Sequence, residues 1–333
     1  MNSKILSYKQ LELANALELA REQRVYSIVD ARVKNMLPQW LQFSPDVFWL
    51  QRPEEQKNLE VFSEAIDFFL KQGIQRGHRI LGIGGGATTD LAGFMAATIH
   101  RGVSWTAIPT TLMGMVDAAI GGKTALNTKH GKNLLGAFHA PDEIWICFDF
   151  LKTLTSQDLA SGKGEIVKYG LLDQGIHDAV MEMKIMTEDL ILQCARYKLD
   201  LVSRDFKDQG ERAFLNLGHT LGHAFEHNLK IPHGLAVTMG LKYILKAFDQ
   251  KEIYEVFSKL VRKLDIDEDK IDLTHYKARF DKDAFWQALG HDKKRSTAGI
   301  NIILVDKIGS PRIESVSLPQ LRSRLEALSD FKG

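Results

Sequence analysis

The chain has 333 residues, of which 44% are hydrophobic and 26% charged, and 43 basic residues balance 42 acidic ones for a net charge of +1. This length and composition are typical of a globular protein of about two domains, and the balanced charge argues against nucleic acid or an anionic membrane as a partner. The two cysteines, Cys147 and Cys194, form no CxxC pattern, which argues against a disulfide scaffold or a cysteine zinc site. Because no signal-like N-terminus and no apolar run of membrane-spanning length is present, we expect a cytoplasmic protein.

The first half of the chain alternates strand-like apolar runs with helical patterns. We predict strands at residues 24–30, 79–84, 105–109 and 143–148, and helices at residues 60–72 and 90–99. Strands that alternate with helices are typical of a mostly parallel sheet, so we predict an N-terminal α/β domain of the Rossmann-like, dinucleotide-binding kind.

After about Phe150 the pattern becomes almost wholly helical. We predict helices at residues 157–171, 179–202, 211–228, 234–246 and 253–264, and one strand at residues 299–305. The sequence therefore predicts two domains, residues 1–150 and residues 151–333, the second of them mainly α-helical.

A glycine-rich segment, residues 82–90, connects a predicted strand to a predicted helix. Glycines let backbone amides approach a phosphate, and a helix N-terminus favours the negative charge. The match to the dinucleotide pattern GxGxxA is weak by itself, because the segment follows about eighty residues of chain and is not on the first strand. No Walker A pattern is present. A tight turn without a ligand is the alternative, and three successive glycines favour phosphate binding over it.

The segment from Arg212 to His223 is rich in polar residues at helical spacing. Arg212, Asn216, His219 and His223 fall at i, i+4, i+7 and i+11, which would place all four on one face of a single helix. Their neighbours are apolar, which favours a packed helix with a wet, anion-binding, metal-bearing face over a solvated polar face. Spacing alone makes His219 and His223 the paired metal ligands, since histidines at i and i+4 are a common zinc arrangement.

Several motifs in one fixed order cover most of the chain. They are GGG at 84–86, DLAGF at 90–94, PTTL at 109–112, VDAAIGGKT at 116–124, GKNLLGAF at 131–138, EIVKYG at 165–170 and LNLGHTLGH at 215–223. Together they closely resemble the 3-dehydroquinate synthase family of sugar-phosphate cyclases. The resemblance implies an NAD-binding α/β domain followed by a helical metal-binding domain. It also implies a homodimeric enzyme of the shikimate pathway, a phosphate-eliminating lyase that makes 3-dehydroquinate from 3-deoxy-D-arabino-heptulosonate 7-phosphate.

The resemblance assigns the metal site to Glu165, His219 and His233, and reassigns His223 to proton transfer. Two imidazoles and a carboxylate suit a catalytic zinc ion, with cobalt as the alternative. The residues that match the family's catalytic positions are His223, Asp208, Lys168, Arg212 and Asn216.

Cations and polar groups match the two charged ends of the substrate. Lys123, Lys168 and Asn133 match the phosphate cradle, and Arg101 matches a residue that the family supplies across a dimer interface. The residues that match the carboxylate and hydroxyl contacts are Lys198, Arg212, Asn216, Asp117 and one of Lys293 and Lys294. The residues that match the NAD-binding positions are Asp30, Glu54, Lys57, Gly85, Gly86, Asp90, Thr110, Thr111, Lys132, Phe150 and Thr153.

Three positions depart from the family pattern. Asp208 stands where a glutamate is usual, Thr89 where a glycine is usual, and Leu235 where a glutamate usually follows the histidine-glycine pair. The change at Leu235 removes an expected hydrogen-bond acceptor near the metal histidine. The departures leave two alternatives, a sister cyclase acting on another sugar phosphate and a metal-dependent polyol dehydrogenase. A non-catalytic binding protein would be expected to have a broken metal triad.

Overall fold

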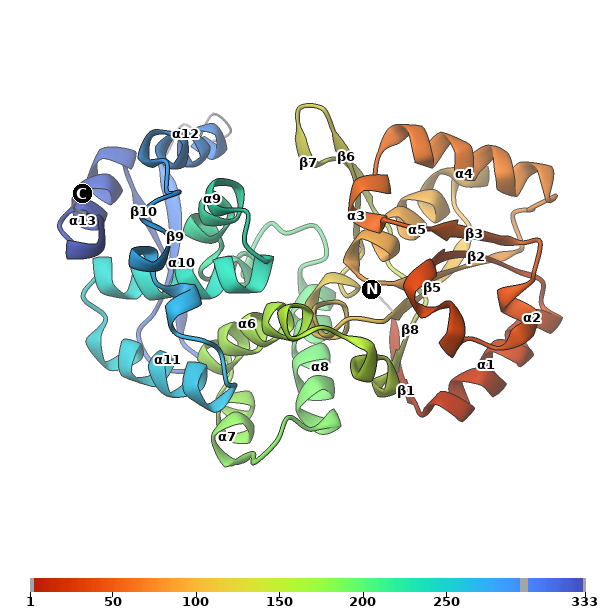
Figure 1. Ribbon diagram of the computed structural model, residues 1–333, viewed down its shortest axis with the longest axis horizontal. Coiled ribbons are helices and arrows are strands. Elements are labelled where there is room, and N and C mark those ends of the chain that lie inside the picture. Colours follow the sequence, from red (N-terminus) through yellow and green to blue (C-terminus); the bar gives the residue numbers. More distant parts are fainter. Residues whose placement is uncertain (1–2, 294–298, 332–333) are drawn as a thin grey trace. The chain divides into compact units, whose positions relative to one another are not determined.

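The computed structural model describes residues 3–293 and 299–331 and divides into two compact units (Figure 1). Unit 1 comprises Met1–Thr155 and Ala195–Asp208, and unit 2 comprises Ser156–Cys194 and Gln209–Gly333. The sequence predicted the division near Phe150. In the structure it falls five residues later, because Phe148 and Phe150 of the 3-10 helix Phe148–Thr153 are buried in unit 1.

A parallel sheet forms the centre of unit 1, as the sequence predicted, but it has six strands where four were predicted, because the short strands Lys4–Tyr8 and Val47–Leu50 were missed. Its order is β1-β8-β5-β4-β2-β3. The strands are β1 (Lys4–Tyr8), β2 (Val25–Asp30), β3 (Val47–Leu50), β4 (Arg79–Gly84), β5 (Ser104–Pro109) and β8 (Glu143–Cys147). Every residue of β2 is buried, as expected for a central strand of a parallel sheet that is covered on both faces.

Helices follow the strands of unit 1. They are α1 (Gln10–Glu22), α2 (Gln39–Gln42), α3 (Pro53–Gln56), α4 (Leu59–Lys71) and α5 (Gly86–Thr98). The last begins four residues before the predicted start, because Gly85 is its extended N-cap and residues 86–89 already form the first turn. The glycine segment therefore joins a strand to the N-terminus of a helix, as predicted.

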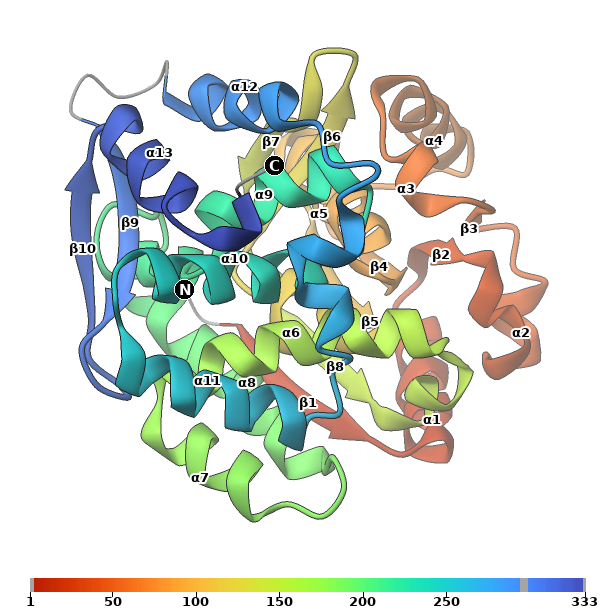
Figure 2. The same cartoon turned by 60° about the vertical axis from the view of Figure 1, so that its left-hand side comes forward.

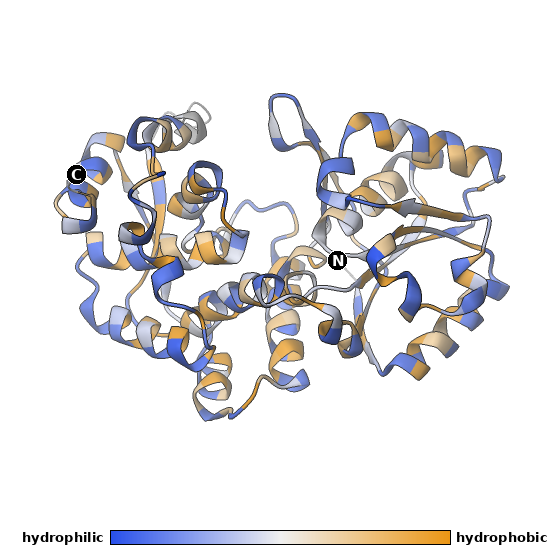
Figure 3. Ribbon diagram, in the orientation of Figure 1, coloured by the Kyte–Doolittle hydropathy of each residue, from blue (hydrophilic) through white to orange (hydrophobic). Residues whose placement is uncertain are grey.

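The antiparallel hairpin of β6 (Lys123–Thr128) and β7 (Gly131–Phe138) was not predicted. Six successive residues at the start of β7, 131–136, are exposed, so this strand lacks the alternating burial that predicts strands from sequence. The tip of the hairpin is hydrophilic (Figure 3).

Unit 2 is mainly helical, as predicted (Figure 2). Its helices are α6 (Ser156–Leu172), α7 (Gln174–Glu182), the first part of α8 (Glu188–Arg204), α9 (His219–Leu229), α10 (His233–Ala247), α11 (Lys251–Lys263), α12 (Lys282–Lys293) and α13 (Leu318–Glu326). The predicted strand at 299–305 is β9 (Ile300–Val305), which pairs with β10 (Pro311–Val316). No helix in the described parts of the chain is both long enough and apolar enough to cross a bilayer.

Two of the predicted helices are broken. The helix predicted at 179–202 is interrupted after Met183, and α8 begins with Thr187 Oγ1 accepting a hydrogen bond from the Leu190 amide. The helix predicted at 211–228 is a 3-10 helix, Glu211–Asn216, followed by α9. The break is at Gly218, whose φ of 81° is left-handed and whose α-carbon lies against α10, where a Cβ would meet Leu241 Cγ at 2.7 Å.

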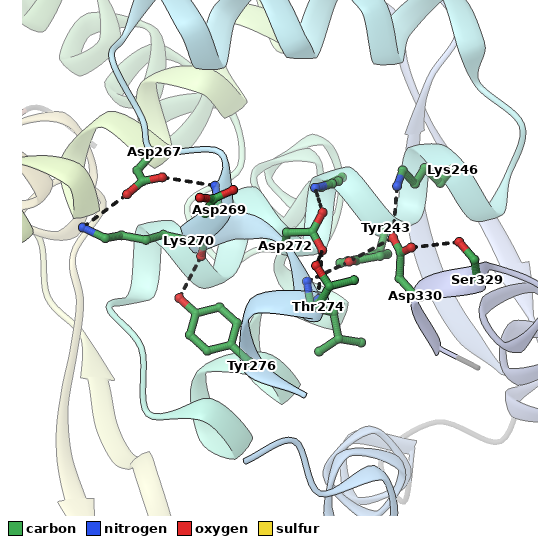
Figure 4. A network of polar contacts seen from close by, with 12 residues as sticks. Tyr243, Lys246, Asp267, Asp269, Lys270, Asp272, Thr274, Tyr276, Ser329 and Asp330 are labelled. Carbon is green, nitrogen blue, oxygen red and sulfur yellow. Dashed lines mark hydrogen bonds and ion pairs between the residues drawn. The ribbon is translucent and has the colours of Figure 1, made fainter. Parts of the chain in front are cut away.

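A polar network fixes the middle of α10 to the end of the described chain (Figure 4). The Tyr243 hydroxyl donates to Asp330 Oδ2 at 3.2 Å and accepts from the Leu273 amide at 2.9 Å. Lys246 Nζ also donates to Asp330 Oδ2, at 3.1 Å. The ring of Phe331 packs edge-on against Tyr243. Since α10 begins at His233, this network supports a helix that carries a predicted metal ligand.

Candidate functional site

Close backbone contacts of glycines bring α6, α9 and α10 together. A Cβ on Gly164 of α6 would lie 2.1 Å from the Gly234 carbonyl oxygen of α10. A Cβ on Gly240 of α10 would lie 2.1 Å from the Gly218 carbonyl oxygen, just before α9. Three of these four glycines adjoin a predicted metal ligand in the sequence, because Gly164 precedes Glu165, Gly234 follows His233 and Gly218 precedes His219.

The predicted metal ligands converge in unit 2. Glu165 Oε1 lies 3.7 Å from His219 Nε2 and 3.5 Å from His233 Nε2. Ring nitrogens of His219, His223 and His233 lie within 4.8 Å of one another. The Glu165 side chain is fully buried. A buried carboxylate that faces imidazole nitrogens at these distances is a donor set that fits a divalent transition metal such as zinc.

The protonation of the histidines favours metal binding at His219. Burial lowers the pKa of His219 to about 3, so its imidazole is neutral at pH 7 and offers a lone pair. Burial also lowers the pKa of His233, but its contacts with Glu165 and Glu226 outweigh this effect and raise it to about 10. The two carboxylates therefore favour positive charge at this position.

Lys168, a predicted phosphate contact and catalytic residue, forms an ion pair with Glu165 one helical turn away. Both side chains are almost completely buried. The pair places a buried positive charge beside the candidate metal ligand Glu165.

The four polar residues predicted on one helix face do not share a helix, so that prediction is wrong. Arg212 and Asn216 lie on the 3-10 helix, whereas His219 and His223 lie on the first turns of α9. The left-handed Gly218 separates the two pairs. Arg212 is buried, and Asn216 and His223 are exposed.

In unit 1, predicted NAD-binding residues gather around the Lys57 ammonium group. Lys57 Nζ lies 2.8 Å from Asp90 Oδ2 and donates to Asn133 Oδ1 at 2.7 Å. Asn133, on β7, was predicted as a phosphate contact of the substrate. Burial raises the pKa of the Asp90 carboxyl to about 6, against the lowering effect of the Lys57 ammonium. Lys132 and Glu54 form an ion pair at 3.6 Å, so α3, α5 and the hairpin all contribute to this cluster.

The remaining predicted NAD-binding residues lie at the ends of strands or directly after them. Asp30 ends β2, accepts a hydrogen bond from the Arg32 amide at 3.0 Å and forms an ion pair with the Arg32 guanidinium. Gly85 and Gly86 begin α5, and Thr110 and Thr111 follow β5. Phe150 is buried in the 3-10 helix after β8, where Thr153 Oγ1 donates to its carbonyl oxygen at 2.7 Å.

Two predicted substrate lysines of unit 1 each pair with a predicted acid. Lys198 Nζ lies 2.9 Å from Asp117 Oδ1, and Lys123 Nζ forms an ion pair with Asp208. Asp208 has a left-handed φ of 58°. This aspartate, which stands where the family usually has a glutamate, is long enough to reach Lys123.

Other predicted positions are placed as follows. Arg101 is exposed and has a left-handed φ of 62°. The predicted substrate contact at Lys293 or Lys294 lies outside the described side chains. Thr89 Oγ1 donates to the Gly86 carbonyl oxygen at 3.1 Å, so this unusual residue is satisfied within its own helix.

Sequence reasoning missed Glu226, whose Oε2 accepts a hydrogen bond from His233 Nδ1 at 2.8 Å. The signal was present, because His219, His223 and Glu226 fall at i, i+4 and i+7.

Comparison with known proteins gives the family. The model described as 3-dehydroquinate synthase N-terminal matches residues 47–161, and the model described as 3-dehydroquinate synthase C-terminal matches residues 162–295. The chain is 38% identical to the 3-dehydroquinate synthase of Pyrococcus furiosus, over 88% of this chain and 87% of that one. It is 34% identical to the 3-dehydroquinate synthase of a Streptococcus pneumoniae strain, over 92% of this chain and 91% of that one.

A solved structure shares the fold. It is a 2-epi-5-epi-valiolone synthase from Streptomyces hygroscopicus with NAD+ and Zn2+ bound, with a TM-score of 0.78, 22% identity, and coverage of 99% of this chain and 97% of that one. The two family matches and the sequence identities show that the chain is an enzyme that belongs to the 3-dehydroquinate synthase family.

Proposed function

We propose that the chain converts 3-deoxy-D-arabino-heptulosonate 7-phosphate into 3-dehydroquinate and inorganic phosphate. The proposed cofactors are NAD and one divalent metal ion, for which zinc is our first choice. The observation that carries the proposal is the convergence of Glu165, His219 and His233 on three separate elements of a chain of this family. The first two helical turns of α9 also supply His223, so a base adjoins the ligand set.

A bound metal ion would supply a Lewis acid for the substrate hydroxyl that is oxidised, and bound NAD would supply a hydride acceptor that is regenerated, so that no net NADH would form. The ligands proposed for the metal are Glu165, His219 and His233. The residues proposed for NAD are Asp30, Glu54, Lys57, Gly85, Gly86, Asp90, Thr110, Thr111, Lys132, Phe150 and Thr153. The start of α5 supports the NAD proposal, because backbone amides at a helix N-terminus favour an anion.

The protein's own side chains then have three tasks. Arg212 binds the substrate carboxylate, because its guanidinium offers two parallel donors. Lys123, Lys168 and Asn133 bind the phosphate that leaves. His223 moves a proton near that phosphate, a role that suits an exposed imidazole beside the ligand set.

Asp117 positions a substrate hydroxyl. Lys198 and Asn216 contact the carboxylate end of the substrate. We propose that Asp208 orients the side chain of Lys123, because the two side chains form an ion pair. We further propose a homodimer in which Arg101 reaches the partner's substrate. An exposed arginine held at a left-handed φ suits such a contact.

Phosphate release from the heptulosonate phosphate tests the function, with purified protein, zinc and a trace of NAD. We expect release in large excess over NAD, with no accumulation of NADH. Net NADH accumulation without phosphate release would instead mean a polyol dehydrogenase. Release only from another sugar phosphate, from a panel of six- and seven-carbon compounds, would mean a sister cyclase.

A further inference from the structure

We infer that Glu226 is a positioning residue that holds the imidazole of His233 in the orientation needed for metal binding. This inference rests on the metal centre of the proposed function, and it is independent of which sugar phosphate is the substrate. Its basis is one contact between two consecutive helices. His233 Nδ1, at the start of α10, donates to Glu226 Oε2, on α9, at 2.8 Å.

The chemistry of the two side chains fixes which ring nitrogen faces the metal. An ionised carboxylate can only accept a hydrogen bond, so Nδ1 of His233 carries the proton. In a neutral imidazole the lone pair is then on Nε2. This nitrogen lies 3.5 Å from Glu165 Oε1, on the side of the ring that faces the other candidate ligand. The contact with Glu226 therefore selects the tautomer that presents Nε2 as a ligand.

The backbone around the contact limits the freedom of both side chains. Lys230 ends α9 in a left-handed conformation, with a φ of 52°, and Pro232 is the N-cap of α10, with its φ held near −56° by the ring. The chain thus reverses between Glu226 and His233 within a few residues. The side chains are 21% and 31% exposed, so water competes only partly for the contact.

Glu226 also supplies an acceptor of the kind that was expected from residue 235. There the family pattern led us to expect an acceptor near the metal histidine, and this chain has a leucine. Leu235 is buried, with 4% of its surface exposed, and has no polar group to offer. The acceptor is supplied instead from α9, one helical turn after His223.

An ordinary ion pair that only joins α9 to α10 is the competing explanation. Such a pair would contribute to stability and leave metal affinity unchanged when it is removed. A positioning role predicts instead that metal affinity falls, because removal of a partner that orients a metal-binding histidine typically weakens metal binding about 10- to 100-fold. The glutamine variant separates hydrogen bonding from charge, since its amide oxygen still accepts from Nδ1.

The test is zinc affinity of the full chain by chelator competition, without NAD or substrate, for wild type, Glu226→Ala, Glu226→Gln and Glu255→Ala. Glu255 is an exposed glutamate on α11 and serves as the matched control. We expect Glu226→Ala to weaken zinc binding about 10- to 100-fold and Glu226→Gln to recover most of that loss. We expect Glu255→Ala to match wild type. Unchanged affinity in Glu226→Ala, or equal losses in the alanine and glutamine variants, would overturn the inference.

A second measurement reads the imidazole itself and does not depend on stability. Two-bond proton–nitrogen correlation spectra of the zinc-loaded chain report the histidine tautomer. We expect His233 to be protonated at Nδ1 in wild type and in Glu226→Gln, and a ligand Nδ1 would contradict the inference. Wild type that binds no zinc would overturn the metal centre and the inference together. A chain that binds zinc but releases no phosphate would overturn only the proposed reaction.

Discussion

Lys198 and Asp117 are joined twice, because Lys198 Nζ lies 2.9 Å from the Asp117 carboxylate and donates to the Asp117 carbonyl oxygen at 2.7 Å. The two residues are 81 positions apart in the sequence. Both are proposed substrate contacts, and on that proposal the lysine is held in place by a residue that acts on the same ligand.

Coupling between these two residues is the first prediction. Lys198→Met keeps the aliphatic stem but leaves a partly buried carboxylate without this partner, at a cost of about 1–3 kcal/mol in the free energy of unfolding. We expect Asp117→Asn to relieve part of that cost in the double variant. Urea unfolding of both single variants and the double variant measures the coupling energy. Strictly additive losses would show that the two side chains do not interact.

The second prediction concerns His219. Replacement by alanine removes a neutral imidazole from the ligand set, so we expect zinc content and phosphate release to fall together. Metal analysis after gel filtration and the phosphate assay give the two values on one sample. Stoichiometric zinc in His219→Ala would refute the assignment of this ligand. Far-UV circular dichroism controls for folding.

The third prediction concerns Arg212, which is buried on its 3-10 helix. Arg212→Lys keeps a positive charge but loses the two parallel donors that match a carboxylate. We therefore expect KM for the heptulosonate phosphate to rise at least about tenfold, with a smaller change in kcat. Arg204→Lys, at an exposed position of α8, is the matched control. An unchanged KM in Arg212→Lys would remove Arg212 from the carboxylate role.

The fourth prediction concerns the contact between α6 and α10. A methyl group at residue 164 would lie 2.1 Å from the Gly234 carbonyl oxygen, so Gly164→Ala forces the helices apart. We expect a loss of about 1–3 kcal/mol in the free energy of unfolding. We also expect weaker zinc binding, because Glu165 and His233 lie on the two separated helices. Gly290→Ala, where a Cβ would meet no heavy atom within 4 Å, is the control and should not destabilise the protein. Wild-type stability and zinc affinity in Gly164→Ala would show that the helices adjust freely.

The fifth prediction concerns pH and Asp272. Burial alone would raise the pKa of Asp272, but hydrogen bonds from Lys242 and Thr274 hold it at about 2 (Figure 4). A carboxyl whose pKa is lower in the folded state stabilises the fold above its unfolded pKa, and this contribution disappears as the pH falls through the folded pKa. We expect Asp272→Asn to be less stable than wild type by a constant amount above about pH 5, and the difference to shrink between about pH 4 and pH 2. A difference that grows as the pH falls would contradict the pKa of Asp272.

Much of unit 1 was predictable because its signals are local. Buried strands such as β4 are continuous apolar runs, and the glycine segment marks the turn into α5. The strand β7 of the hairpin escaped prediction because its residues are almost all exposed and follow no period. The hairpin joins the cluster through the hydrogen bond between Lys57 and Asn133. These two residues are 76 positions apart, so no local sequence pattern predicts the contact.

In unit 2 the positions of the helices were predictable and their breaks were not. The helical period continues across Leu217 and Gly218, so the sequence alone favoured one long helix. The break depends on Gly218 lying against Leu241 and Val237, residues that follow it by about twenty positions. The candidate ligands Glu165, His219 and His233 were identified from family motifs, whereas the contact of Glu226 with His233 appears only when α9 and α10 are packed together.

The glycine contacts of α10 have a consequence for how this site tolerates change over evolution. Where helices meet through side chains, a substitution on one helix can be accommodated by a compensating substitution on the other. At Gly234 and Gly240 the facing atoms are backbone carbonyl oxygens of Ser161 and Gly218, which are the same for every amino acid. No second mutation at the facing residues can make room there, so a side chain at either position would force the packed elements apart whatever residue stands opposite.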